Sequence, residues 1–503
     1  MNSIKQLAGQ TVVYGASSIV GRLLNYLLVP LHVYIFTNPS EYGVVGEMYA
    51  WVSLLIVLLV YGMETAFFRY NESRDEKNLV FGSAFISLFI TTALFLVAVF
   101  LFIDPISQIL QYPNNQEYIL WFSFIIALDV LSTIPFARLR AQNRAGRFVF
   151  VKLAGIFTNI ILNLFFLLLA PWLYSQEGLS VLVSWFYSPT MGIGYIFIAN
   201  LFSSAITLLL LISVIKFRDL KFNFALWKGM FIYAFPLLIF GLAGIVNETM
   251  DRILIKHLST PAESMANVGI YSACYKISIL ITIFIQAFRY AAEPFFFSKA
   301  KEKDAKETYA TVMSYFVVTC SIIFLSIMMY IDIVQYFVSE PYRVGLGIVP
   351  ILLLANVFLG IFYNLSVWYK VTGQTKFGAY ISILGVVITL AMNFILIPLV
   401  GYVGAAWTTL VCYFVMSVAS YVLGQKHYHV NYNLQKIFGY LFLALFLYLV
   451  SLTYQNIALS LKLALNSVVL IGYLTIIYFV ERKSLKLIFL NDNSKNEYEN
   501  EQD

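Results

Sequence analysis

Long runs of apolar residues, each ended by a short polar loop, follow one another along the whole of this chain. A helix that crosses a membrane needs about 20 predominantly apolar residues. The pattern therefore predicts an all-α polytopic membrane protein with about fourteen transmembrane helices. The expected spans are 12–36, 43–68, 79–103, 118–137, 148–171, 190–215, 229–256, 266–296, 308–331, 345–369, 377–399, 402–424, 435–455 and 459–480.

The composition supports this interpretation. Of the 503 residues, 60% are hydrophobic and 12% are charged, and the mean hydropathy is +0.81. A soluble domain has roughly 45–50% apolar and about 25% charged residues, so the composition excludes a water-soluble fold. The first expected span contains Arg22 and lacks the short apolar run and cleavage site of a signal peptide, so we expect it to be retained.

Lysine and arginine gather in alternate loops, as they do in the cytoplasmic loops of membrane proteins. The intervening loops contain only Lys256, Arg343 and Lys462. Both termini are therefore expected on the cytoplasmic side. This asymmetry and anionic lipid head groups explain the net charge of +6, so the charge predicts no nucleic-acid partner. The three cysteines lie far apart within expected spans and indicate small buried side chains, not a disulfide framework or a metal site.

The second half of the chain resembles the first. Gly43 and Tyr49 align with Gly269 and Tyr275, and a second alignment matches Gly155 to Gly385 and Asn163 to Asn393. Each match joins expected spans that are six helices apart, and an even number of spans gives the two halves the same orientation. We therefore expect two parallel-repeat six-helix lobes, 1–222 and 223–428, followed by a terminal helix pair, 429–482, and a polar cytoplasmic tail, 483–503.

Ionisable residues inside the expected spans are the candidate functional residues, because one basic group at a helix centre costs about 2.5–3.5 kcal/mol. Glu248 and Arg252 are four residues apart, as are Arg289 and Glu293, so each pair could neutralise itself on one helix face. Intramembrane charges more often mark a transport path. We therefore favour a water-filled cavity lined by "NETMDR". The basic residues are Arg22, Arg252, Lys276 and Arg289, and the acidic ones are Glu64, Glu248, Asp251 and Glu293.

Several of these stretches resemble the polysaccharide flippases of the multidrug/oligosaccharidyl-lipid/polysaccharide exporter superfamily. The resemblance covers nearly the whole chain and rests on "GR" in span one, "NETMDRILI" in span seven and "VGIYSACYK" in span eight. It implies that an undecaprenyl-diphosphate-linked oligosaccharide is moved from the inner to the outer face of the bacterial cytoplasmic membrane. It also implies a central cavity with basic residues, which Arg22, Arg252 and Arg289 match best.

The same resemblance implies membrane lipids, a polysaccharide polymerase and glycosyltransferases as partners, and no bound cofactor. Coupling to protons or sodium stays open, with Glu64, Glu248 and Asp251 as candidates. Related lipid II flippases carry another basic residue within span two, whereas this chain has Glu47 and Glu64 there. This difference from the lipid II flippases makes lipid II itself a less favoured substrate.

Three alternative classes of protein share part of this pattern. An ion-coupled multidrug or small-solute antiporter of the same superfamily would share the fold, but it would favour carboxylates over arginines in the cavity. A major-facilitator carrier usually has twelve spans and a basic glycine-containing loop, which residues 69–82 do not supply. A membrane glycan polymerase or ligase needs catalytic groups in an outer loop, and the longest such loop, 170–192, has only Glu177 as an ionisable residue. The sequence therefore predicts no enzyme.

Overall fold

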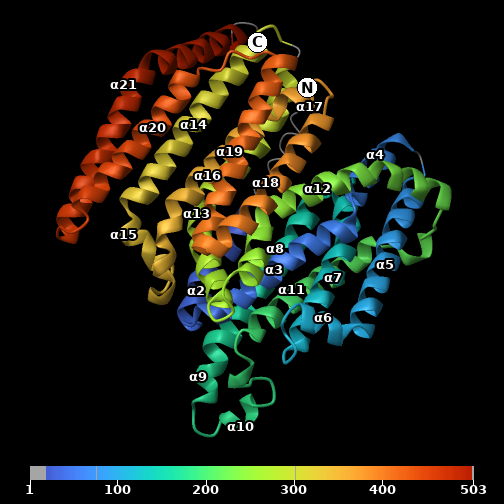
Figure 1. The fold of residues 1–503 in the computed structure, drawn as a ribbon. Coiled ribbons are helices and arrows are strands. Elements are labelled where there is room, and N and C mark those ends of the chain that lie inside the picture. Colours follow the sequence, from blue (N-terminus) through green and yellow to red (C-terminus); the bar gives the residue numbers. More distant parts are fainter. Residues whose placement is uncertain (1–18, 75, 301, 501–503) are drawn as a thin grey trace. The chain divides into compact units, whose positions relative to one another are not determined.

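Helices account for the regular structure of this chain. The computed structural model describes residues 19–74, 76–300 and 302–500, with side chains up to residue 482 except that of Asp219. These residues contain no strand. Thirteen helices are long and apolar enough to cross a membrane, and a shorter apolar helix, Ile19–Ile35, precedes them (Figure 1). The predicted all-α polytopic fold is confirmed, while residues 12–18 of the first expected span lie outside the described residues.

The helices have the following bounds. The first half of the chain contains α2 (Leu28–Ile35), α3 (Pro39–Val60), α4 (Met63–Ser73), α5 (Lys77–Leu101), α6 (Ile103–Ile109), α7 (Gln116–Ala141), α8 (Ala145–Leu164), α9 (Ala170–Tyr174), α10 (Ser180–Val183) and α11 (Gly194–Leu211). The second half contains α12 (Phe224–Leu258), α13 (Ser264–Lys299), α14 (Ala305–Met329), α15 (Ile331–Val334), α16 (Val349–Leu365), α17 (Val367–Val371), α18 (Lys376–Val400), α19 (Tyr402–His427), α20 (Leu434–Ser451) and α21 (Leu459–Asn500).

Some expected spans are less regular than the apolar pattern suggests. The second span consists of α3 and α4, which are separated by Tyr61 and Gly62 at φ +36° and +73°. Both values lie in the left-handed region, which interrupts a right-handed helix. The fifth span runs from α8 through a π-helical turn, Phe165–Leu169, into α9. Apolar runs therefore located the spans but not their internal breaks.

The chain divides into two compact units, Met1–Glu302 with Phe337–His429, and Lys303–Tyr336 with Val430–Asp503. In the second unit, Lys436 and Tyr440 of α20 both donate to the Glu481 carboxylate of α21 at 2.7 Å. Asn466 of α21 donates to the Met329 carbonyl of α14 at 2.6 Å. Polar side chains thus tie together α14, α20 and α21. The division into lobes at 222 and 428 stays a prediction.

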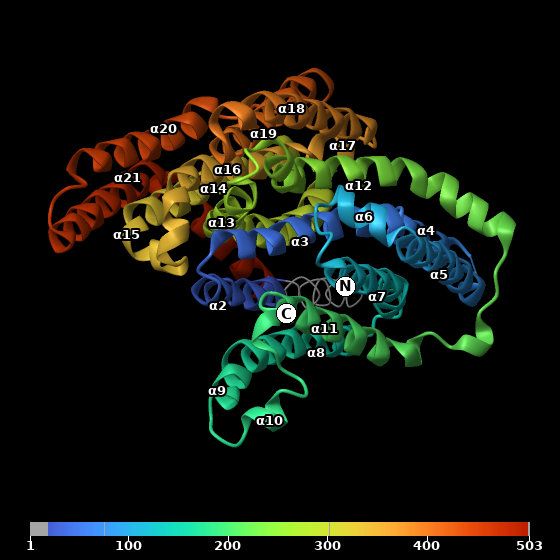
Figure 2. The same cartoon turned by 60° about the horizontal axis from the view of Figure 1, so that its bottom comes forward.

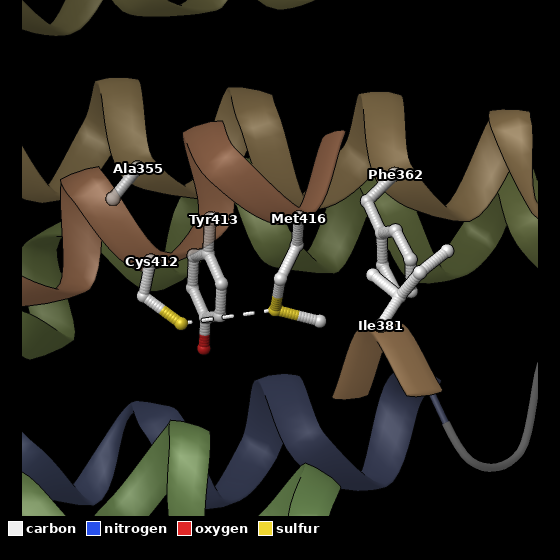
Figure 3. Packing of buried hydrophobic residues seen from close by; sticks show 6 residues of the cluster. All are labelled: Ala355, Phe362, Ile381, Cys412, Tyr413 and Met416. Atoms are coloured by element: carbon white, nitrogen blue, oxygen red, sulfur yellow. Dashed lines mark hydrogen bonds between the residues drawn. The ribbon is translucent and has the colours of Figure 1, made fainter. Parts of the chain in front are cut away.

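In the first unit, helices that are distant in sequence pack side by side. α3 lies along α13, and α12 lies along α18 (Figure 2). Between α16, α18 and α19 lies an apolar cluster formed by Ala355, Phe362, Ile381, Cys412, Tyr413 and Met416 (Figure 3). In this cluster the Cys412 Sγ lies 3.7 Å from the Met416 Sδ. All three cysteines are free and buried, which confirms the role expected for them.

The aligned glycines of the two halves lie at close helix contacts. A Cβ at Gly43 of α3 would lie 2.1 Å from the Met265 carbonyl oxygen, and one at Gly269 of α13 would lie 1.9 Å from the Pro39 carbonyl oxygen. These two glycines therefore allow α3 and α13 to touch through their backbones. A Cβ at Gly155 of α8 would meet Thr207 of α11, and one at Gly385 of α18 would meet both Asn247 of α12 and Met416 of α19. Each of the four aligned glycines therefore lies where another helix packs closely.

Candidate functional site

Two polar cavities adjoin each other in the first unit. Their volumes are about 360 Å³ and about 350 Å³. The helix Ile19–Ile35, α12 and α13 line both; α3, α8 and α11 complete the first cavity, and α16 completes the second. The two cavities are neighbouring compartments because they share lining residues, namely Asn25, Val29, Glu248, Tyr275, Lys276 and Ile279.

All four basic residues expected to bind substrate line these cavities. Arg252 lines the first, Arg22 and Arg289 line the second, and Lys276 lines both. In the described part of the chain, no carboxylate lies within ion-pair distance of any of the four. The described lining of the two cavities therefore contains four cations and one carboxylate, that of Glu248, and this excess of positive charge attracts an anionic group.

Aromatic rings hold two of these guanidinium groups. Arg252 lies 4.5 Å from the ring centre of Tyr275, and its Nη1 donates to the Glu248 backbone carbonyl at 3.0 Å. Arg289 lies 4.5 Å from the ring centre of Tyr363. A cation over an aromatic face is stabilised without losing its charge. The arrangement positions both guanidinium groups and keeps them cationic.

The two helical pairs with a spacing of four residues do not form the ion pairs that would neutralise them. Glu248 contacts Arg252 through its backbone carbonyl, and the Glu293 carboxylate pairs with Lys370 of α17. Glu248 itself is exposed and lines both cavities. The simpler interpretation, in which each pair only holds one helix face together, therefore does not describe these residues.

The other acidic candidates lie outside both cavities. Asp251 is buried and accepts hydrogen bonds from Tyr271 at 2.6 Å, Thr409 at 2.9 Å and Asn393 at 3.0 Å. These three donors are neutral, so they satisfy the carboxylate oxygens without pairing the charge. Glu64 pairs with Arg140 instead. Of the predicted acidic set, only Glu248 lines the two main cavities.

A chain of amide side chains, which were not among the predicted site residues, lines the first cavity. The His32 ring contacts the Asn163 Oδ1 at 2.8 Å, Asn163 donates to the Asn159 side chain at 3.1 Å, and Asn159 donates to Asn25 at 3.2 Å. Asn200 of α11 donates to the Tyr49 hydroxyl at 2.6 Å. Asparagine offers both donors and acceptors. The only signal in the sequence was the alignment of Asn163 with Asn393.

A buried ion pair lies one turn after the cavity-lining Arg252 of α12. The Lys256 ammonium lies 2.8 Å from the Glu47 carboxylate and 2.6 Å from the Leu110 carbonyl oxygen, and the two charged side chains are 2% and 0% exposed. The Tyr112 hydroxyl donates to the same carboxylate at 2.5 Å. Burial, followed by the Glu47 charge, raises the pKa of Tyr112 above its ordinary value. This group, Glu47, Lys256 and Tyr112, is called the buried triad below.

The buried triad corrects the expectation that Lys256 lies in a loop. α12 continues to Leu258, so Lys256 belongs to its last turns. Its side chain is turned inward because a carboxylate and a carbonyl there accept hydrogen bonds from its ammonium group. The Tyr342 and Ser339 hydroxyls each donate at 2.5 Å, to the Phe36 and Val33 carbonyls respectively. These two bonds join segments that are 306 residues apart in the sequence.

The fold and the cavities define the class: a polytopic helical membrane protein with a polar, cationic interior. The profile of a family described as polysaccharide biosynthesis protein matches residues 36–343, and the chain belongs to this family. No curated protein matches the sequence significantly. Among the described residues, no three His, Cys, Asp or Glu side chains are grouped to hold a metal ion.

Two solved transporter structures share the fold of this chain. The lipid II flippase MurJ in an inward closed conformation matches with a TM-score of 0.71 and 13% identity, over 94% of this chain and 100% of that chain. An inward-facing multidrug resistance MATE family transporter of the MOP superfamily matches with a TM-score of 0.64 and 15% identity, over 81% and 94% of the two chains. The match to the polysaccharide biosynthesis family confirms the predicted family resemblance, and these two structures confirm the fold that it implied.

Proposed function

We propose that this protein is a flippase that moves an undecaprenyl-diphosphate-linked oligosaccharide from the cytoplasmic to the outer face of the bacterial cytoplasmic membrane. The observation that carries the proposal is the set of four cavity cations, Arg22, Arg252, Lys276 and Arg289, with no carboxylate in ion-pair distance among the described residues. A diphosphate cannot cross hydrocarbon without such compensation, and arginine suits phosphate contacts.

The two cavities differ in a way that fits the two parts of the head group. The second cavity contains Arg22, Lys276 and Arg289 and suits the diphosphate. The first cavity contains Arg252 and Lys276 beside the amides of Asn159 and Asn200, which can donate to and accept from sugar hydroxyls. In this arrangement the lipid tail stays in the bilayer.

Alternating access of the two lobes completes the transport cycle in this proposal. Coupling to protons or sodium is assigned to Asp251, whose buried carboxylate is held only by neutral donors one residue before Arg252. Glu248, exposed in both cavities, is the second candidate. The pathway is surface polysaccharide biosynthesis, such as O-antigen or exopolysaccharide, with glycosyltransferases before the flippase and a polymerase after it.

The test measures flipping of a fluorescent undecaprenyl-diphosphate oligosaccharide in proteoliposomes. Arg252→Ala and Arg22→Ala are each expected to slow flipping by at least about ten-fold, because a hydrogen bond to a charged group contributes about 1.5–3 kcal/mol. Lysine at the same positions keeps the charge and should retain part of the activity. Arg218→Ala is the matched control, because Arg218 is an exposed cation that lines neither cavity.

Two outcomes would contradict the proposal. Normal flipping by both cavity variants would refute a cationic mechanism. If the native protein flips nothing, and instead exchanges cationic drugs or small solutes against an ion gradient, the protein is an ion-coupled antiporter of the same superfamily. The buried carboxylate of Asp251 would then be the first group to substitute.

A further inference from the structure

The longest of the loops expected on the outer side of the membrane is nearly free of charge. It joins α8 to α11 and contains α9 and α10, which extend away from the other helices of the first unit (Figure 1, Figure 2). Between Lys152 and Lys216 the sequence has only one charged residue, Glu177. Surfaces in water are usually rich in charged side chains, so this composition is unusual for a segment surrounded by water. Residues 170–192 are called the α9–α10 loop below.

Large apolar side chains are exposed together on this loop. Val181, Leu182 and Trp185 are 70%, 65% and 87% exposed, while Val183 between them is 4% exposed. The single turn of α10 therefore has a buried inner side and an exposed outer side, and the outer side is apolar. Exposed apolar residues that are grouped in this way mark a surface that binds another molecule or a membrane.

Stacked aromatic rings fix the loop to the membrane-spanning helices. The Tyr195 ring of α11 stacks on the Phe166 ring at 4.7 Å and on the Tyr187 ring at 5.2 Å between ring centres. The Ser188 backbone N–H donates to the Tyr195 hydroxyl at 2.5 Å. Because Tyr195 is buried, these contacts form the inner side of the loop. The loop is thus held in one position, with its apolar side turned away from the protein.

The apolar side of the loop continues the lipid-facing surface of α8. Exposed apolar side chains follow one another along α8 and α9 at intervals of three or four residues, which places them on one helix face. They are Phe157, Ile161, Leu164, Leu168 and Trp172. Lipid tails cover such a face in a membrane helix, and tryptophan is enriched where the tails meet the head groups. The α9–α10 loop therefore begins at the surface of the bilayer.

We propose that the apolar side of this loop, formed by Val181, Leu182 and Trp185, lies in the head-group region of the phospholipid bilayer at its outer face. Burial of apolar side chains and the preference of tryptophan for this region hold the loop there. The loop has no basic residue, so attraction to anionic head groups has no part in the contact. The contact is independent of the flippase proposal, because no residue of the loop lines either central cavity.

Site-directed spin labelling of the full chain in lipid vesicles measures this contact. A nitroxide is attached to Val181→Cys, to Trp185→Cys and, as the control in the same loop, to Glu177→Cys, one at a time. The native chain, whose three cysteines are buried, gives the background. Electron paramagnetic resonance then compares collisions with oxygen, which concentrates in lipid, and with a water-soluble nickel chelate. The oxygen-to-nickel ratio should be at least about three-fold higher at positions 181 and 185 than at 177, since interfacial apolar faces lie about 5–10 Å deep.

Two comparisons sharpen the result. The ratio should be the same in phosphatidylcholine vesicles with and without phosphatidylglycerol, because the loop has no basic residue. With the label at Leu182→Cys, Val181→Glu combined with Trp185→Glu should lower the ratio toward that of position 177, since charge removes the loop from lipid. Equal and water-like ratios at positions 177, 181 and 185 would overturn the proposal. Low collision rates with both reagents at 181 and 185 would also overturn it, because they would indicate that a protein covers this side.

Discussion

Arg252 and Lys256 lie one turn apart in α12, and they show two different uses of a cation within a membrane helix. Lys256 is 2% exposed and pairs with the Glu47 carboxylate at 2.8 Å. Arg252 lines the first cavity, its guanidinium donates to a backbone carbonyl and lies against aromatic rings, and within the described residues it has no ion-pair partner. A buried cation that is paired with a carboxylate contributes to the stability of the fold. A cation that is held in place without a carboxylate partner stays available to bind a ligand. The available acceptors, and not the residue type, decide between the two uses.

Glutamates show the same contrast. Glu47 is fully buried, and both the Lys256 ammonium and the Tyr112 hydroxyl contact its carboxylate. Glu248 is exposed in both cavities, and within the described residues it has no ion-pair partner. Substitutions at the buried triad should therefore act on stability, and substitutions in the cavities should act on transport.

The largest expected effect on stability follows from Lys256→Met. This change leaves the Glu47 carboxylate buried without its counter-charge, and breaking a buried pair in this way costs about 3–5 kcal/mol. The free energy of unfolding, measured by titrating the protein in mixed micelles with a denaturing detergent, should fall by this amount. Glu47→Gln combined with Lys256→Met removes both charges and should recover most of the loss.

Arg252→Met is the matched control for this experiment. It also removes one cation from α12, but it leaves no paired carboxylate behind. Its unfolding free energy should fall by clearly less than that of Lys256→Met, although its flipping activity is lost. Equal destabilisation by the two variants would contradict the distinction between a structural cation and a ligand-binding cation.

A smaller loss of stability is expected from a substitution at the point where α3 and α13 touch. In Gly269→Ala, the new methyl group would lie 1.9 Å from the Pro39 carbonyl oxygen and 3.0 Å from the Gly43 nitrogen, so the two backbones must separate. Overpacking of this kind costs about 1–3 kcal/mol. The same detergent titration should show this loss.

Gly244→Ala is the control for the glycine substitution. Gly244 lies within α12, and a Cβ there would have no atom within 4 Å. Alanine has the higher helix propensity, by roughly 1 kcal/mol in water, so this variant should be at least as stable as the native protein. If Gly269→Ala and Gly244→Ala both lose stability, the close backbone approach at Gly269 is not the cause of the loss.

The sequence predicted the helical fold because a membrane helix must carry its apolar residues in one continuous run. The alignment of Gly43 with Gly269 was evidence for a repeat only, and the structure adds that these two glycines lie at one close backbone contact between α3 and α13. The break at Tyr61 and Gly62 was not predicted, because two residues in the left-handed region do not change the hydropathy of the run.

The cavity cations were predictable because placing a charge inside the membrane costs free energy, so charged residues there usually have a function. The partners of these charges were not predictable, since they come from helices distant in sequence. Glu47 and Lys256 are 209 residues apart, and Lys256 lies so close to the end of its span that it was assigned to a loop. The amides of Asn25 and Asn159 are uncharged and gave no signal until the fold brought them together.

The smallest effect on stability and on flipping is expected for Glu64→Gln. Glu64 pairs with Arg140, but the two side chains are 37% and 34% exposed, and Glu64 lines none of the polar cavities. Half-exposed ion pairs contribute about 0–1 kcal/mol, so the unfolding free energy should change by less than about 1 kcal/mol. Flipping should stay near the native rate, in contrast to Arg252→Ala. If Glu64→Gln instead stops flipping in a fully stable protein, Glu64 takes part in ion coupling, and a carboxylate outside the cavities can control the cations within them.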